Sequence, residues 1–305
     1  MRFENLDQLV ERVKEEPSRR LAVAGSENTV TLQAVARAHD ENIAEAVLFG
    51  DVEKTKALAD EAGVDLSAFE LIEARSAEAA RRAAAAVGKG EADAMMKGGC
   101  STKVFLRAVL DEANGLRTGR LLSHVMVAEI PAYHQLLYLT DAALNISPDL
   151  PAKVDILKNA VGLASSLGCE RPKVAVLAAV EKVNLPAMPC TGDAAALTVM
   201  SRRGQLGDCV VDGPLAFDNA ISAESARIKG IDSEVAGDAD ILLCPDIEAA
   251  NVLYKAFTYF IEAKAGAVVV GAAAPVILPS RADSPETKFL SIAVALGCAA
   301  LSRSN

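Results

Sequence analysis

The chain has 305 residues, of which 51% are apolar and 24% charged, and its net charge is −10 at pH 7. This length suits about two globular domains, and the scattered basic residues argue against a nucleic-acid partner. No apolar run approaches the roughly 20 residues that a membrane span needs, which argues against a membrane partner. Residues 1–10 lack the basic start and apolar centre of a signal peptide, so we expect a cytoplasmic protein.

The first third of the chain alternates short apolar segments with segments of helical spacing. The predicted strands are residues 20–24, 46–49, 69–72 and 92–96. The predicted helices are residues 4–16, 31–39, 54–62 and 77–87. This alternation is typical of a parallel α/β sheet. Polar breaks repeatedly follow the strands, and open α/β sheets bind ligands at the C-terminal ends of their strands.

The turn after the strand at residues 92–96 is a candidate anion site. A glycine pair at 98–99 allows the backbone to approach a ligand closely, and Ser101 and Thr102 follow at a predicted helix N-terminus. Lys97 and Arg107 flank this turn and favour an anionic ligand. The alternative interpretation is a well-capped helix after a tight turn, without a ligand.

In the rest of the chain the same alternation resumes after two strands that could pair antiparallel. The predicted strands are residues 121–130, 136–139, 173–177, 209–211, 241–244 and 267–270. The predicted helices are residues 152–167, 193–203, 219–229, 249–263 and 288–301. The six cysteines are widely spaced and include no C-x-x-C pair, so we expect neither a structural metal nor disulfides.

A second candidate anion site lies between the last predicted strand and the last predicted helix. Its turn holds four polar residues, Ser280, Arg281, Asp283 and Ser284. The positive end of the helix dipole and the Arg281 guanidinium would both favour a phosphate there. The alternative is structural: Ser284 would only cap the helix, with Pro285 at the first helical position and Glu286 in the first turn.

Four segments carry a resemblance to a known family. They are Ala92–Gly98, Val211–Ala220, Ala239–Asn251 and Ser280–Ser284. In this order they resemble the phosphate acetyltransferase and phosphate butyryltransferase family over nearly the whole chain. The segments Met96–Gly98 and Ser280–Glu286 resemble the butyryltransferase branch more than the acetyltransferase branch.

The resemblance implies a fold, an assembly and a reaction. The fold would be α/β and isocitrate/isopropylmalate dehydrogenase-like, with two α/β domains, the second inserted in the first, and an interdomain cleft. The first domain would comprise residues 1–123 and 274–305, and the second residues 124–273. The protein would be a homodimer or larger homo-oligomer. It would reversibly convert acyl-CoA and phosphate into acyl phosphate and CoA, with CoA as a substrate, no tightly bound cofactor and no metal.

The resemblance also assigns roles to individual residues. Ser280 and Arg281 match the pair that holds the acyl phosphate and the reacting thiol. Ser101, Thr102 and Arg107 match the phosphate side of the site, to which the local arguments add Lys97 and Ser284. Lys229, Asn251 and Lys255 match positions near CoA. Where acetyltransferases carry an aspartate proposed as the base for the thiol, this chain has Thr287. Either one of the nearest carboxylates, Asp283 or Glu286, takes over this catalytic role, or no dedicated base is needed.

Three alternatives to a butyryl-type transferase stay open. The first is phosphate acetyltransferase, because one or two methylenes change binding by only about 1–3 kcal/mol each. The second is a metal- and nicotinamide-dependent hydroxy-acid dehydrogenase of the same fold, although only the separated Asp212, Asp218 and Asp246 are available as ligands. The third is a CoA- or nucleotide-binding protein without catalysis, which loss of Ser280 or Arg281 would have favoured.

Overall fold

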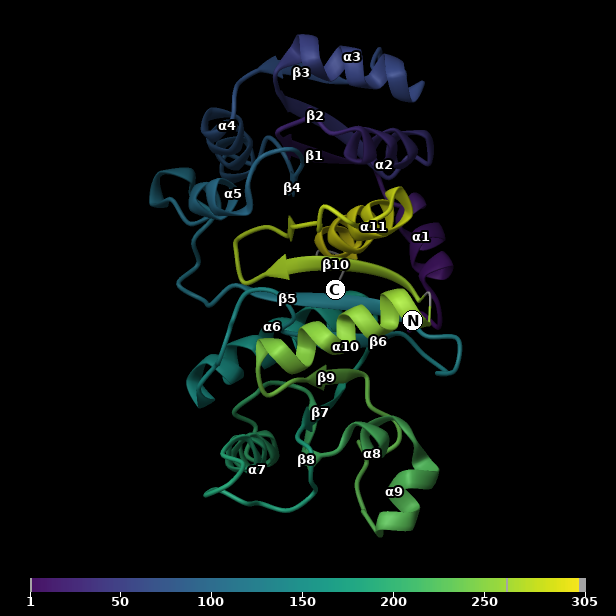
Figure 1. Ribbon diagram of the computed structural model, residues 1–305, viewed down its shortest axis with the longest axis vertical. Coiled ribbons are helices and arrows are strands. Elements are labelled where there is room, and N and C mark those ends of the chain that lie inside the picture. The colour runs from purple at the N-terminus through teal and green to yellow at the C-terminus, as the bar shows by residue number, and fades with distance from the viewer. Residues whose placement is uncertain (1, 262, 302–305) are drawn as a thin grey trace. The chain divides into compact units, whose positions relative to one another are not determined.

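The computed structural model describes residues 2–261 and 263–301. The chain forms two compact units: unit 1 comprises Met1–Leu6 and Leu121–Ala265, and unit 2 comprises Asp7–Arg120 and Gly266–Asn305. Figure 1 shows the course of the chain through both. No helix within residues 2–261 and 263–301 is long and apolar enough to cross a membrane.

Unit 2 is an α/β unit built on parallel strands. Its strands are β1 (Arg19–Ala24), β2 (Ala44–Gly50), β3 (Glu70–Glu73), β4 (Ala94–Lys97), β10 (Lys264–Val270) and β11 (Val276–Ile277). They follow the order β3-β2-β1-β4-β11-β10, and every neighbouring pair is parallel except the antiparallel pair of β10 and β11. Burial on both faces accounts for the nearly continuous apolar sequence of β1 and β4.

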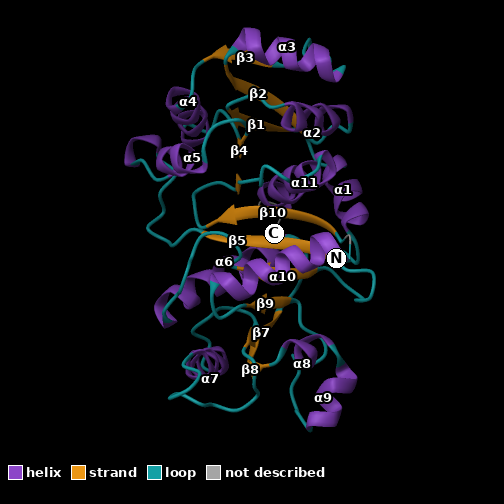
Figure 2. Ribbon diagram, viewed as in Figure 1, coloured by secondary structure: helices purple, strands orange, loops and turns teal. Residues whose placement is uncertain are grey.

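The helices of unit 2 cover both faces of these strands (Figure 2). They are α1 (Leu6–Lys14), α2 (Thr29–Asp40), α3 (Val52–Ala62), α4 (Ala77–Gly88), α5 (Thr102–Val109) and α11 (Pro285–Leu301). Helix α2 packs against α11, and α4 packs against α5. Alanines dominate the buried face of α4, which lets its backbone approach the strands closely. Phe105 of α5 and Phe289 of α11 are among the largest fully buried side chains.

Unit 1 has a mixed sheet. Its strands are β5 (Ser123–Glu129), β6 (Leu137–Thr140), β7 (Lys173–Leu177), β8 (Val210–Leu215) and β9 (Ile241–Leu243). Strands β5 and β6 are antiparallel, whereas β6, β9, β7 and β8 are parallel in that order. Its helices are α6 (Leu150–Ser166), α7 (Cys190–Arg202), α8 (Phe217–Ile221), α9 (Ala223–Lys229) and α10 (Ile247–Phe260). A buried apolar cluster between the sheet and α10 includes Met126, Leu139, Leu242, Tyr254 and Phe257.

The structure corrects two of the predicted elements and adds one strand. The single helix predicted at residues 219–229 is two helices, because Ser222 is extended and its Oγ accepts a hydrogen bond from the Ser225 N–H as a new N-cap. The two-residue strand β11 was not predicted, since such a short segment carries no periodic signal. The last helix begins at Pro285 and not at Lys288. Residue 262 of the predicted helix 249–263, and residues 302–305 of the predicted first domain, lie outside the described residues.

Candidate functional site

Three parallel strands of unit 2 end side by side at one edge of the sheet. Ala24 at the end of β1 is paired with Lys97 at the end of β4. Ile277 at the end of β11 is paired with Met96 of β4. The turns that follow these strands therefore leave the same edge, which is where parallel α/β sheets bind ligands. Two of these turns are the candidate anion sites predicted from the sequence.

The turns after β1 and β4 are in direct contact. The N–H of Gly98 donates to the Ala24 carbonyl at 2.9 Å, and the N–H of Gly99 donates to the Gly25 carbonyl at 2.5 Å. Gly25 has a φ of +77°, and a Cβ at this position would lie 2.7 Å from the backbone nitrogen of Cys100. Only glycine satisfies both the backbone conformation and the space, so this residue sets the spacing of the two turns.

Each of the three turns leads into the N-terminus of a helix. Asn28 caps α2 through its Oδ1, which accepts a hydrogen bond of 2.9 Å from the Thr31 N–H. Ser101 caps α5 by accepting from the Val104 N–H at 3.3 Å, and Ser284 caps α11 by accepting from the Thr287 N–H at 3.1 Å. The capping role predicted for Ser284 is thus confirmed. A capping hydroxyl still has its own hydrogen to donate, so Ser101 and Ser284 also remain candidates for an anion.

Lysine and arginine side chains gather at this strand edge. Lys97 and Lys288 are buried, with 6% and 3% of their surface exposed. Burial lowers the pKa of Lys97, and the nearby Arg281 lowers this pKa further. Burial also lowers the pKa of Lys288, against which Asp283 acts to raise it and Lys97 to lower it. Three cations and one carboxylate therefore lie within electrostatic reach of one another.

The turn at 280–284 is shaped by its own carboxylate. Asp283 Oδ2 accepts a hydrogen bond of 2.7 Å from the Ser280 N–H, and the Ser280 carbonyl accepts one of 3.3 Å from the Asp283 N–H. Ser280 and Arg281 are exposed at the tip of this turn. Such an arrangement leaves both side chains open to a ligand while the backbone beneath them is fixed.

The remaining predicted residues of unit 2 lie differently. Glu286 forms an ion pair with Arg37 of α2, so its carboxylate is engaged outside the turn. Arg107 is exposed in the last turn of α5, about one and a half turns from the exposed Thr102 at the start of that helix. The hydroxyl of Thr287 lies 3.1 Å from that of Ser284 and stabilises the cap.

Cys100 lies beside this group but is not a reactive thiol. Its Sγ donates to the Ala24 carbonyl at 3.3 Å. Burial raises the pKa of the Cys100 thiol to about 11, even though Lys97 acts in the opposite direction. A thiol with this pKa carries almost no thiolate at neutral pH, so Cys100 contributes no nucleophile.

The three predicted CoA residues belong to unit 1. Lys229 at the end of α9 forms a 3.1 Å ion pair with Glu181, and its hydrogen bond lowers the pKa of that carboxyl group. Asn251 of α10 donates to the Ala142 carbonyl at 3.0 Å. The Lys255 ammonium lies 5.0 Å from the ring centre of Tyr254. Asn251 thus forms a hydrogen bond within unit 1, whereas Lys229 and Lys255 supply positive charge, that of Lys229 being paired with Glu181.

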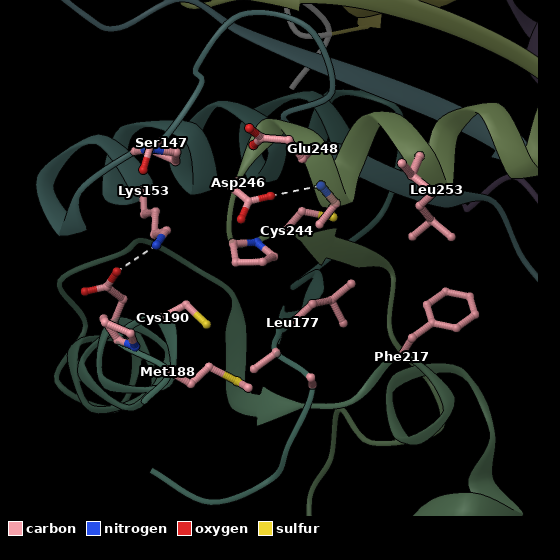
Figure 3. Close-up of a pocket in the computed structure, with 18 of the residues that line it drawn as sticks. Ser147, Lys153, Leu177, Met188, Cys190, Phe217, Cys244, Asp246, Glu248 and Leu253 are labelled. Atoms are coloured by element: carbon pink, nitrogen blue, oxygen red, sulfur yellow. Dashed lines mark hydrogen bonds and ion pairs between the residues drawn. The ribbon is translucent and has the colours of Figure 1, made fainter. Parts of the chain in front are cut away.

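Unit 1 also contains a cavity of about 1120 Å³. Figure 3 shows Leu177, Met188, Cys190 and Phe217 around it, together with an ion pair between Lys153 and Asp193. Lys153 Nζ lies 2.6 Å from Asp193 Oδ2, and Lys153 is only 4% exposed. The lining is mostly apolar and comes from the C-terminal ends of β7 and β9 and from the starts of α6, α7 and α10. Its composition is that of a small-molecule site, and its volume is slightly above the usual range of about 300–1,000 Å³.

The cavity carries more acids than bases. Besides the Lys153–Asp193 pair its lining includes Asp149, Asp246 and Glu248. Asp149 and Asp246 cap α6 and α10, and therefore already occupy those two helix N-termini. A negatively charged group would be disfavoured here, so the cavity suits an uncharged ligand part. Among residues 2–261 and 263–301, no group of three or more His, Cys, Asp or Glu side chains is arranged to hold a metal ion.

Sequence reasoning missed two features of these sites. Lys288 was assigned no role, because its inward direction depends on the packing of α11 against α2. The pairing of Lys153 with Asp193, 40 residues apart, was also missed. The only local signal for Lys288 was a lysine in the first turn of a helix, where cations are unfavourable.

The chain thus consists of two α/β units, one with a cationic strand edge that suits an anion and one with a largely apolar cavity that suits an uncharged organic group. The family described as phosphate acetyl/butaryl transferase matches residues 5–85 and 75–296, and the chain belongs to this family. The family predicted from the sequence is thereby confirmed.

Individual relatives agree with this membership. Phosphate butyryltransferase of Clostridium beijerinckii is 48% identical over 292 residues, which cover 95% of this chain and 96% of that protein. Phosphate acetyltransferase of Thermotoga maritima is 46% identical over 289 residues, which cover 95% and 98%. The crystal structure of a branched-chain phosphotransacylase from Enterococcus faecalis V583 superimposes with a TM-score of 0.82 at 33% identity and covers 92% of this chain and 99% of that one.

Proposed function

We propose that the protein reversibly transfers a short-chain acyl group, butyryl or similar, between CoA and inorganic phosphate. The observation that carries this proposal is the group formed by Lys97 at the end of β4, Arg281 in the turn after β11 and Lys288 near the start of α11, in a chain of this family. A group of cations beside three helix N-termini suits a small, highly charged anion such as phosphate. We further propose that the fold belongs to the isocitrate/isopropylmalate dehydrogenase-like class, with domains at 1–123 plus 274–305 and at 124–273.

The chemistry needs a thiolate, a place for charge on the carbonyl oxygen and a hold on the phosphate. In the direction of acyl-CoA formation, the CoA sulfur attacks the carbonyl carbon of the acyl phosphate. The new C–S bond forms, the C–O bond to phosphate breaks, and the thiol proton is lost. In this proposal Arg281 and Ser280 stabilise the reacting end, while Lys97, Ser101, Thr102, Arg107 and Ser284 supply the phosphate side. Preorganised donors of this kind typically contribute about 10²–10³ in rate each.

Removal of the thiol proton contributes less to the rate than positioning of the two substrates. A thiol with a pKa near the ordinary value of about 8.5 is already a few per cent ionised at neutral pH. A positioned base adds roughly 10²–10⁴ in rate, whereas correct positioning of two substrates can contribute roughly 7–11 kcal/mol. Of the two carboxylates near Thr287, we favour Asp283 over Glu286 because Glu286 is bound to Arg37.

We propose that CoA binds to unit 1 through Lys229, Asn251 and Lys255. The two lysines suit the phosphates of CoA, and the cavity suits its uncharged pantetheine arm. Cys190 lines this cavity and offers a reporter: its alkylation, followed by peptide mass spectrometry, should slow in the presence of CoA. Equal alkylation rates with and without CoA would remove the cavity from the CoA site.

We also propose a homodimer or larger homo-oligomer. Helix α10 and the residues after it expose the apolar side chains Val252, Tyr259, Phe260 and Ile261. Exposed apolar side chains that are close in the sequence in this way are typical of a protein interface. Sedimentation equilibrium would give the subunit number directly.

The experiment that tests the function is an acyl-transfer assay with chelator present. Phosphate-dependent release of CoA should be measured with acetyl-, propionyl-, butyryl- and isobutyryl-CoA. We expect turnover with at least one of them, fastest with a four-carbon chain. A faster rate with acetyl-CoA would identify an acetyltransferase instead, and no turnover with any of the four would reject the enzyme.

A further inference from the structure

Lys97 and Lys288 are buried cations whose hydrogen bonds, within the described residues, go to neutral groups. Lys97 Nζ donates to the Gly98 carbonyl at 3.2 Å. Lys288 Nζ donates to Thr31 Oγ1 at 3.3 Å and to Asn28 Oδ1 at 3.4 Å. In the described part of the chain, the ion pairs of 4.0 Å or less include neither of these lysines. A buried lysine is almost always paired, because an uncompensated charge in the interior is costly.

The same protein contains a buried lysine that does have a carboxylate partner. Lys153 in unit 1 is as deeply buried as Lys288, and its ammonium lies 2.6 Å from the carboxylate of Asp193. The carboxylate of Asp193 thus compensates the charge of a buried lysine, although Lys153 also lines the cavity of unit 1. Among the described residues Lys97 and Lys288 have no carboxylate within 4.0 Å, which leaves their charge for a ligand to compensate.

Nearby positive charges and helix N-termini make the burial of Lys97 and Lys288 still less favourable when no ligand is bound. Lys288 lies in the first turn of α11, and its ammonium contacts Asn28, the N-cap of α2. It is thus close to the positive ends of two helix dipoles. Lys97 adds a second positive charge, and Arg281 a third. Asp283 opposes them, and Glu27 in the turn after β1 acts on the adjacent Cys100, so three cations face two carboxylates. The net positive charge that is left would be neutralised by a bound anion.

We propose that Lys288 binds the phosphate group of the substrate directly, together with Lys97. The family resemblance assigned no role to Lys288, and its position follows the threonine that stands in place of the acetyltransferases' aspartate. The ligand class is inorganic phosphate and the phosphoryl end of an acyl phosphate. This inference depends on the proposed function only for the identity of the anion.

The test measures binding of inorganic phosphate alone, without CoA, by calorimetry at constant ionic strength. Lys288→Met should weaken phosphate binding by about 10- to 100-fold, the loss typical of a hydrogen bond to a charged group. Lys288→Gln retains the hydrogen bonds to Thr31 and Asn28 but not the charge, and should weaken binding equally. The exposed Lys54 on α3 gives the matched control, and Lys54→Met should leave the affinity unchanged.

Thermal unfolding distinguishes binding from a structural role. Without phosphate, Lys288→Met should be at least as stable as the wild type, because it removes an unpaired buried charge. With phosphate, the wild type should gain more stability than the variant. An affinity unchanged in Lys288→Met, or restored in Lys288→Gln, would overturn the proposal. So would an equal loss of stability with and without phosphate.

The outcomes also separate this inference from the proposed function. Normal acyl transfer by the wild type, with phosphate affinity unchanged in Lys288→Met, would refute only the role of Lys288. Weakened phosphate binding in Lys288→Met, in a protein that transfers no acyl group, would refute only the acyltransferase function.

Discussion

Gly25 offers a direct test of the geometry that holds the anion site together. Its Cβ, if present, would lie 2.7 Å from the backbone nitrogen of Cys100 and 3.1 Å from that of Gly99. Both contacts are with backbone, which cannot rotate away as a side chain can. Gly25→Ala should therefore force the turns after β1 and β4 apart. Gly63 gives a matched control, because its φ of +66° is similar and nothing lies within 4 Å of its added Cβ.

The two variants share one energetic cost and differ in another. A non-glycine residue in the left-handed conformation costs roughly 1–2 kcal/mol, and both variants carry this cost. Gly25→Ala adds the cost of overpacking, typically about 1–3 kcal/mol. We therefore expect losses of about 1–2 kcal/mol for Gly63→Ala and about 2–5 kcal/mol for Gly25→Ala. The difference should lower the Tm of Gly25→Ala by a further 2–12 °C or so, at about 2–4 °C per kcal/mol.

Denaturant unfolding and phosphate calorimetry on the same samples would measure both consequences. Phosphate binding should weaken about tenfold or more in Gly25→Ala, because small displacements of positioning groups have large effects. It should not change in Gly63→Ala. Equal losses of stability in the two variants would refute the close approach of the turns. A large loss of stability in Gly25→Ala with normal phosphate affinity would refute the link between this contact and the anion site.

Three further changes test separate parts of the structure. Arg281→Ala should reduce turnover by about 10²–10³-fold, far more than Glu286→Gln, in steady-state assays; the reverse order would show the roles to be misassigned. Lys153→Met should destabilise the protein by about 1–3 kcal/mol in urea, because Asp193 loses its partner while partly buried; a loss near zero would contradict this. The pKa of Lys288 is lowered by burial from its ordinary value of 10.5, so without phosphate the unfolded state holds more protons between the folded pKa and 10.5. The free energy of unfolding of the wild type relative to Lys288→Met should thus rise with pH in this window, and a constant difference would count against it.

The features that could be predicted from the sequence were those with a local cause. The alternative interpretation of the Ser-Pro-Glu run at 284–286, a capped helix with Pro285 at its first position, is confirmed, whereas the apolar spacing alone placed the start of this helix at Lys288. The turn after β4 was predicted in the same way, because the glycine pair at 98–99 and the capping Ser101 follow the strand directly in the sequence. The antiparallel pairing suggested for residues 136–139 is confirmed by β5 and β6. In each case neighbouring residues alone determine the backbone path.

What could not be predicted depends on packing between distant segments. Glu286 and Lys288 are two residues apart in the same helix, yet Glu286 faces Arg37 and Lys288 faces Thr31. Nothing local distinguishes these directions, because they follow from how α11 packs on α2. The strand β11 has only two residues and exists because β4 and β10 lie beside it. The roles assigned to individual site residues likewise remain predictions until they are tested by mutation.

The distribution of charge explains why anion binding and acyl-chain choice are separate properties. A net charge of −10 opposes the approach of phosphate, so in the proposed site the affinity would come from the local cations Lys97, Arg281 and Lys288. These groups cannot sense the length of an uncharged acyl chain. Chain length must be sensed by apolar walls, at only about 0.8 kcal/mol for each buried CH₂. Relatives named for butyryl and for acetyl transfer are 48% and 46% identical to this chain, so overall identity does not distinguish the two chain lengths.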